Sequence, residues 1–125
     1  MKIDLIPDEN GMVKIISDKK CWSKFADIIP YEKAIIHVRE GSSYIKDKST
    51  IVKRHSQQQL RKLIFKRDKG KCHYCGNEAT TLDHKKPRSK GGYSTPANLV
   101  CCCYICNQKK GNLDYYEFMR LIGRK

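Results

Sequence analysis

The chain has 125 residues, enough for one domain or for a small domain with an appendage. Lys and Arg number 26 against 13 Asp and Glu, spread along the chain, which gives a formal net charge of +13. Such a surface favours a polyanionic partner, although many small cationic proteins bind no nucleic acid. The opening MKIDLIPDENG contains early acidic residues and no long apolar run. We therefore expect neither a signal peptide nor a membrane span, and a cytoplasmic location.

Residues 1–55 predict a short α/β region of unknown role. Hydrophobic patterning indicates a strand over residues 12–16 and then an apolar helical repeat that Pro30 ends. The members of that repeat are Trp22, Phe25, Ala26 and Ile29. Residues 34–38 favour a second strand. After a turn at Gly41, further extended segments are expected at residues 44–45 and 51–52.

Residues 56–125 predict a second region that begins with a helix. Ser56 and Gln59 have the spacing of a capping box, and Gly70 is placed to end the helix. The sequence CHYCGN follows as a knuckle in which Gly76 is available for positive φ. We expect this knuckle to lead into a strand over residues 80–84.

The remainder of this region predicts a loop, a strand and two helices. The loop contains a Gly-Gly turn and a brief helical turn that begins at Thr95 and Pro96. Residues 99–102 are apolar and suit a strand beside the first one. A helix over residues 103–110 follows, and Asp114 then caps the last helix.

Two Cys-x-x-Cys pairs, 31 residues apart, are the strongest signal in the sequence, and they consist of Cys72, Cys75, Cys103 and Cys106. Four thiolates closing one tetrahedron are typical of a structural zinc that leaves no ligand position for a substrate. A reducing compartment keeps such thiols free for metal. A thiol-redox protein is the weaker alternative, because two pairs at this separation suit one zinc better than a dithiol switch. Cys101 and Cys102 are most simply small buried residues.

The motifs between and around these pairs occur in a recognisable order. They are Asp83-His84, Pro-x-Ser-x-Gly-Gly, Asn-Leu-Val and Cys-Asn-x-x-Lys-Gly. Together with the cysteines they resemble the HNH endonuclease family in its four-cysteine branch, over roughly the last seventy residues. The resemblance implies an α+β fold: a small ββα-metal, treble-clef-like HNH domain over residues 56–125, with a structural zinc.

The resemblance also assigns chemical tasks to the polar residues. His84 matches the family's general base, and a neutral imidazole can accept a proton at cellular pH. Asp83 matches a ligand of the catalytic divalent cation, and strand alternation turns it to the opposite face from His84. Asn107 matches the second ligand, which makes the chain an H-N-N variant. Hard oxygen ligands of this kind suit Mg²⁺ or Mn²⁺. Asn98 matches the middle Asn, which is expected to brace the loop and so orient the base.

Structural explanations compete with each of these assignments. An Asp-His pair is often a surface turn or a hydrogen-bonded structural pair when the surrounding motifs are absent. Asn98 could cap the turn after Pro96, and Asn107 could cap the zinc knuckle.

Basic residues near the catalytic candidates are expected to contact DNA phosphates, which fixes register without reading bases. They are Lys85, Lys86, Arg88, Lys90, Lys109 and Lys110. About half of them could instead be solvated charges. The hypothesis favoured by the sequence is a metal-dependent DNA endonuclease or nickase that acts on duplex DNA, with a homodimer as one route to cutting both strands. The alternative is a zinc-stabilised nucleic-acid-binding module of the same fold without catalysis.

Overall fold

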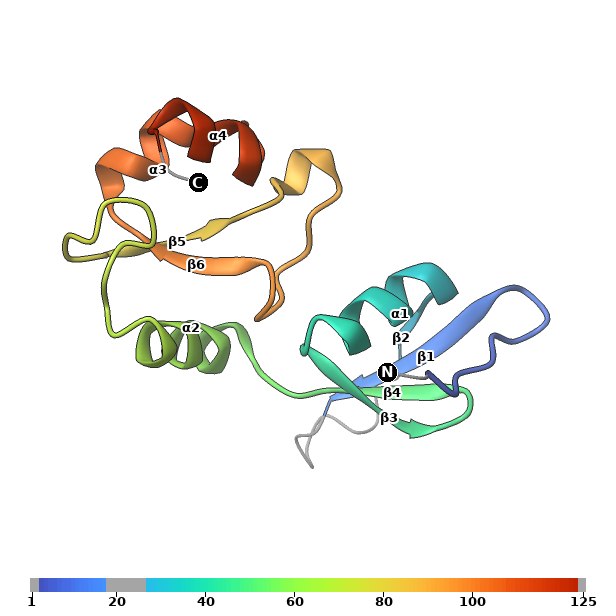
Figure 1. Cartoon of the computed structure of the whole chain (residues 1–125). Coiled ribbons are helices and arrows are strands. Elements are labelled where there is room, and N and C mark those ends of the chain that lie inside the picture. The colour runs from blue at the N-terminus through green and yellow to red at the C-terminus, as the bar shows by residue number, and fades with distance from the viewer. Residues whose placement is uncertain (1–2, 18–26, 124–125) are drawn as a thin grey trace. The chain divides into compact units, whose positions relative to one another are not determined.

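The computed structural model of the protein describes residues 3–17 and 27–123 and divides the chain into two compact units, Met1–Gln57 and Gln58–Lys125 (Figure 1). Within the described ranges, no helix is both long enough and apolar enough to span a bilayer. Most of the apolar repeat expected near Trp22, Phe25 and Ala26 lies outside the described residues.

The first unit is built on a mixed four-stranded sheet. Its strands are β1 (Met12–Ser17), β2 (Asp27–Pro30), β3 (Ser43–Asp47) and β4 (Thr50–Lys53). They lie in the order β2-β1-β4-β3, with β1 and β4 parallel and the other two pairs antiparallel. Helix α1 (Tyr31–Arg39) connects β2 to β3 and packs against the sheet (Figure 1).

Two expectations for this unit are wrong. Residues 34–38, expected as a strand, lie in α1, and Ile29, expected in a helix, lies in β2. Pro30 is the N-cap of α1, so this proline begins the helix that follows it. Ala34 and Val38 are one helical turn apart and both buried in the core. Burial of this helical face outweighs the strand preference of the local β-branched residues.

The second unit has a two-stranded sheet with helices around it. Strands β5 (Thr81–His84) and β6 (Leu99–Cys102) pair antiparallel, and His84 lies opposite Leu99 at the end of the ladder. Figure 1 shows α2 below this pair and α3 and α4 above it. The helical segments are α2 (Gln57–Arg67), η2 (Arg88–Lys90), α3 (Tyr104–Lys110) and α4 (Tyr115–Leu121).

The strand, loop, strand and helix expected for this unit are confirmed, and so is its α+β ββα-metal fold class. Gly76 adopts a φ of 81°, and the carboxylate of Asp114 caps α4 by accepting a hydrogen bond from the Glu117 amide. The helical turn expected at Thr95 is a simple turn; the loop's 3₁₀ segment is η2 instead.

The guanidinium of Arg67 fastens α2 to the loop and to β6. It donates hydrogen bonds of 2.6 Å to the carbonyl oxygens of Pro96 and Leu99. The neighbouring carboxylate of Asp68 accepts a hydrogen bond from the Cys101 amide. These contacts and the buried side chain of Ile64 place α2 against β6, so the strand that begins opposite His84 has a fixed support.

Candidate metal centre and active site

The four cysteines of the two Cys-x-x-Cys pairs come together in the second unit, with all their sulfur atoms within 4.8 Å of one another. The sulfurs of Cys75 and Cys103 are 3.7 Å apart. Tetrahedral zinc with Zn–S bonds of about 2.3 Å requires sulfur separations of roughly 3.8 Å, whereas a disulfide requires about 2.05 Å. The donor set and its spacing therefore fit one zinc ion with a structural role.

The knuckle and the start of α3 place these thiols. The amide of Cys72 donates to the carbonyl of Asn77, and the amide of Gly76 donates to the carbonyl of Cys72. Cys103 is the N-cap of α3, and its sulfur accepts a hydrogen bond from the Cys106 amide. Burial by itself raises the pKa of the Cys72 thiol, but backbone amides, led by that of Cys103, donate hydrogen bonds that lower it to about 6. A thiolate ready for metal is thus favoured at this position.

The neighbouring side chains that could compete as ligands are placed elsewhere. Cys101 and Cys102 are fully buried in β6, as the sequence predicted for small core residues. Burial raises the pKa of both thiols, so they stay protonated. The Nε2 atom of His73 shares a 2.9 Å hydrogen bond with the Tyr115 hydroxyl. Among the residues that the structure describes, the metal cluster therefore consists of the four cysteines.

The loop between β5 and β6 is closed by Asn98, which is buried. Its Oδ1 accepts a hydrogen bond from the Lys86 amide, and its Nδ2 donates to the carbonyl oxygens of Lys86 and Tyr93. A Cβ atom added at Gly92 would lie 1.8 Å from the Lys86 oxygen and 3.0 Å from Asn98 Nδ2. Close backbone approach therefore requires glycine here, and the loop that follows His84 is braced from within.

His84 lies at the end of β5 and is half-buried. Its Nε2 shares a 2.9 Å hydrogen bond with the hydroxyl of Ser94, which fixes the orientation of the ring. Burial lowers the pKa of the imidazole below its ordinary value of 6.5. The charge of Asp83 opposes this shift, and the cations Arg88 and Lys110 add to it. The imidazole is consequently neutral at pH 7 and able to accept a proton.

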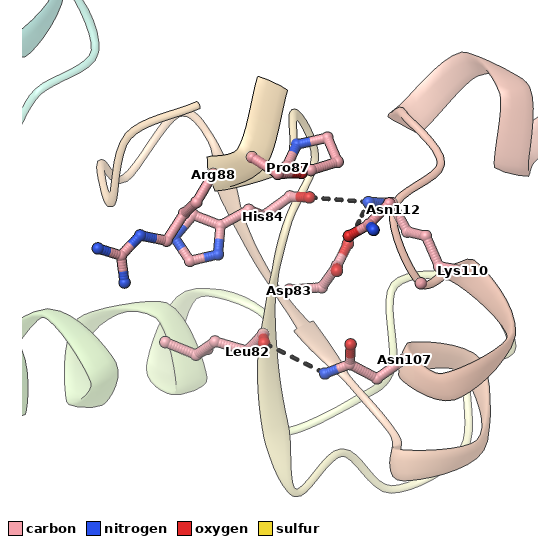
Figure 2. A pocket seen from close by; sticks show the side chains of 10 residues that line it. Leu82, Asp83, His84, Pro87, Arg88, Asn107, Lys110 and Asn112 are labelled. Carbon is pink, nitrogen blue, oxygen red and sulfur yellow. Dashed lines mark hydrogen bonds and ion pairs between the residues drawn. The ribbon is translucent and has the colours of Figure 1, made fainter. Parts of the chain in front are cut away.

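Asp83 is buried and points to the other side of β5 from His84 (Figure 2). Its Oδ2 accepts a 2.7 Å hydrogen bond from the Tyr74 hydroxyl and lies 3.3 Å from Lys110 Nζ. Burial, followed by the bond to Asp83, raises the pKa of Tyr74, so this hydroxyl remains a donor. The carboxylate is held through one of its two oxygens.

The carboxamide of Asn107 is oriented by its nitrogen. Nδ2 donates to Thr81 Oγ1 at 3.0 Å and to the Leu82 carbonyl at 3.4 Å. In Figure 2 the carboxamide oxygen is turned to the side of Asp83. The chain thus presents an amide oxygen and a carboxylate, two hard donors, within one site.

These groups line one open pocket of about 240 Å³ at the end of β5 (Figure 2). Its lining includes Asp83, His84, Arg88, Asn107, Lys110 and Asn112. The residues matched to the family's base and to its two cation ligands therefore meet in space. Asn98 lies behind them and shapes the loop without lining the pocket.

The six basic residues expected to contact DNA are placed differently from one another. Lys86, Arg88 and Lys109 are exposed. Lys90 is exposed and lies 3.6 Å from Glu117, and Lys85 is half-buried with its ammonium 5.1 Å from the Tyr115 ring centroid.

Lys110 departs from the DNA contact expected for it. It is 1% exposed, and its Nζ donates to the His84 carbonyl at 2.8 Å in addition to its contact with Asp83. A buried ammonium that is already paired does not reach a phosphate. Sequence reasoning also missed Tyr74 and Ser94, because nothing local to either residue indicates its partner.

Comparison with known proteins agrees with this site. Residues 72–113 match the family model described as HNH endonuclease. A stretch of 49 residues is 43% identical to the CRISPR-associated endonuclease Cas9 of Corynebacterium diphtheriae, covering 35% of this chain and 4% of that relative. The matched stretch therefore spans only a small part of that much longer protein. Residues 72–113 thus form a domain of the HNH endonuclease family, in its four-cysteine form.

Proposed function

We propose that the protein is a metal-dependent DNA endonuclease or nickase whose active site is the pocket at the end of β5. The observation that carries this proposal is the convergence of His84, Asp83 and Asn107 on one pocket. A binding module that had lost catalysis would have no need for all three side chains in this arrangement. The relative with 43% identity is itself named an endonuclease.

His84 is the general base of the proposed reaction. The ring is fixed through Nε2, which leaves Nδ1 to take a proton from the water that attacks the phosphorus atom. Burial keeps the imidazole neutral, which is the form that accepts this proton. The brace made by Asn98 holds the loop that carries Ser94, so it acts on catalysis by positioning.

Asp83 and Asn107 would hold the catalytic Mg²⁺ or Mn²⁺. Their donor atoms are oxygens, which those ions prefer, and the Asn107 nitrogen is already committed to β5. A cation bound here would stabilise the charge on the phosphate and on the departing 3′-oxygen. Both contacts to Asp83 fall on Oδ2, so Oδ1 is the oxygen we assign to the ion.

Duplex DNA is the proposed substrate because the exposed basic side chains lie in and beside the loop that borders the pocket. Arg88 itself lines the pocket, and Lys86 is exposed two residues earlier in the same loop. Phosphate contacts from such residues set the position of the strand without selecting a base sequence. Cutting both strands through a homodimer and a cytoplasmic location stay predictions.

Cleavage of supercoiled plasmid with Mg²⁺ or Mn²⁺ tests the proposal. We expect His84→Ala to lower the cleavage rate by about 10²–10⁴-fold while zinc content and DNA affinity stay at the parent level, since a base acts only in the transition state. His55→Ala, in the first unit, is the matched control and should cut at the parent rate. A His84→Ala protein that cuts as fast as the parent, or a parent that cuts no DNA, would leave the zinc-stabilised binding module as the better description.

Substitutions at the two oxygen donors should act through the cation instead. Asp83→Asn removes an anionic donor, so cleavage should require much more Mg²⁺ or disappear. Asn107→Ala should have a smaller effect, because water can partly replace a neutral carbonyl donor. Equal cation requirements in both variants and the parent would remove these residues as the cation site.

A further inference from the structure

Lys110 is the one buried cation among the described Lys and Arg residues. Its ammonium donates to the His84 carbonyl at 2.8 Å and lies 3.3 Å from Oδ2 of Asp83 (Figure 2). The Asp83 side chain is buried with it. Burying an ion is costly unless an opposite charge and hydrogen bonds compensate for the lost water, and this pair supplies both.

The carboxylate in this pair is held from two directions. The Tyr74 hydroxyl donates to the same Oδ2 atom at 2.7 Å, from the knuckle, while Lys110 reaches it from the end of α3. Two donors on one oxygen fix the rotation of the carboxylate. Asp83 is therefore ordered and charge-compensated by the protein's own side chains.

We propose that Lys110 is a resident counter-cation for Asp83. It holds the carboxylate in one orientation in the protein alone, and its charge lowers the affinity of that carboxylate for a divalent ion. This inference rests on the proposed function in one respect, since it takes Asp83 as a ligand of the catalytic cation. Two cations that share a carboxylate repel each other strongly at short range in a medium of low dielectric constant.

The consequence is an order of binding. With Lys110 in place, the protein binds Mg²⁺ or Mn²⁺ weakly until a DNA phosphate adds further negative charge to the pocket. The divalent ion and the DNA therefore bind with positive cooperativity, and each raises the affinity for the other by the same factor. A lysine that only filled space would not lower the affinity for the divalent ion in the absence of DNA.

Titration of the zinc-loaded full chain with Mn²⁺, without DNA, tests this role. Lys110→Met keeps the length of the side chain and removes its charge, so we expect Mn²⁺ to bind about tenfold more tightly or better. Lys110→Arg keeps the charge and should stay within about threefold of the parent affinity. The double variant Asp83→Asn, Lys110→Met should lose the gain, because the carboxylate that produces it is gone.

Thermal unfolding provides a second readout that a purely structural role would not move. Lys110→Met leaves the Asp83 carboxylate without a counter-ion, so its Tm should fall and then recover in part when Mg²⁺ is added, whereas the parent Tm should hardly respond. Lys110→Gln, which retains a donor toward the His84 carbonyl, should show the same gain in Mn²⁺ affinity with less loss of Tm. If Lys110→Met folds only with added cation, the Mn²⁺ affinity of Lys110→Gln still tests the proposal.

The inference is overturned if folded Lys110→Met or Lys110→Gln binds Mn²⁺ with the parent affinity, or if the lost Tm shows no recovery with Mg²⁺. Neither measurement contains DNA or a cleavage step. A parent that cuts no DNA would therefore overturn the proposed function and not this inference. An unchanged Mn²⁺ affinity in the Lys110 variants would overturn this inference in a protein that still cuts DNA.

Discussion

The two compact units of the chain are held together by different interactions. The first has a four-stranded sheet over a core of aliphatic side chains such as Leu5, Val13 and Ile51. The second has a sheet of two strands, and it contains the cysteine cluster and buried polar side chains that include Asp83 and Asn98. In the second unit, the four-cysteine cluster and satisfied hydrogen bonds stand where the first unit has strand pairing.

Charge is divided just as unequally. Residues 58–125 contain 15 Lys and Arg against five Asp and Glu, whereas residues 1–57 contain 11 against eight. Both units are net positive, as expected from basic residues spread along the chain, but most of the excess lies in the second. The unit that contains the four-cysteine cluster therefore also has the larger excess of positive charge, and its buried polar network lies beside the pocket.

The largest expected effect is loss of the metal. Cys103→Ser should lose zinc and unfold the second unit, because a structural zinc contributes binding free energy on the order of 10 kcal/mol to folding. Metal analysis with amide hydrogen exchange would show the first unit still protected. Cys102→Ala, one residue away and outside the cluster, should keep its zinc. A parent whose second unit is folded without metal would contradict the four-thiolate site.

The next largest effect is expected from substituting one buried polar residue in each unit and comparing the loss of stability. Asn98→Ala removes three hydrogen bonds and leaves buried backbone groups unpaired, so unfolding of the second unit should become easier by about 2–4 kcal/mol. Ser43→Ala in β3 removes a buried hydroxyl that has no partner, and the first unit should be unaffected or slightly stabilised. Denaturant unfolding followed separately in each unit measures both. Equal losses of unfolding free energy in the two variants would mean that buried polar groups stabilise the second unit no more than the first.

The salt dependence of DNA binding tests the difference in charge between the two units. With Lys110 buried, five of the six basic candidates remain, so log affinity should fall with log salt at a slope of roughly −4 to −5. Replacing Lys86 and Lys109 by Gln should reduce the slope by about one unit for each lost contact. The same change at Lys46 and Lys48, exposed in the first unit, is the control and should leave the slope unchanged. A flat salt dependence in the parent would remove nucleic acid as the partner.

The smallest effect concerns two histidines, one in each unit. Burial, chiefly, lowers the pKa of both His37 and His84 below 6.5, so both should titrate at more acidic pH than an exposed histidine in an NMR experiment. Each folded form then binds fewer protons than the unfolded chain, so both contributions to stability are lost as pH falls through 6.5 and below. The cleavage rate should fall as His84 becomes protonated, and it should not depend on the titration of His37. A rate that follows the His37 titration instead would contradict the assigned base.

Prediction from the sequence succeeded where signals between residues close in sequence agree with the observed fold. In the second unit, the knuckle glycine, the Asp114 cap and the two cysteine pairs each have a local physical cause, and the strands and helices follow them. In the first unit, residues 34–38 contain β-branched side chains that suit a strand and a helix face almost equally. Packing against the sheet decided in favour of the helix, and packing does not appear in a local pattern.

The sequence by itself determined the ligand set of the metal cluster and the order of elements around it, because the chelate spacing and the turn chemistry act over a few residues. Only the tertiary structure decided what Lys110 does. Its neighbours Lys109 and Gly111 are exposed, yet its own side chain is buried against Asp83 of β5. That placement depends on how α3 packs on a strand 26 residues earlier in the chain. A pattern of neighbouring residues carries no information about a contact so far apart in sequence.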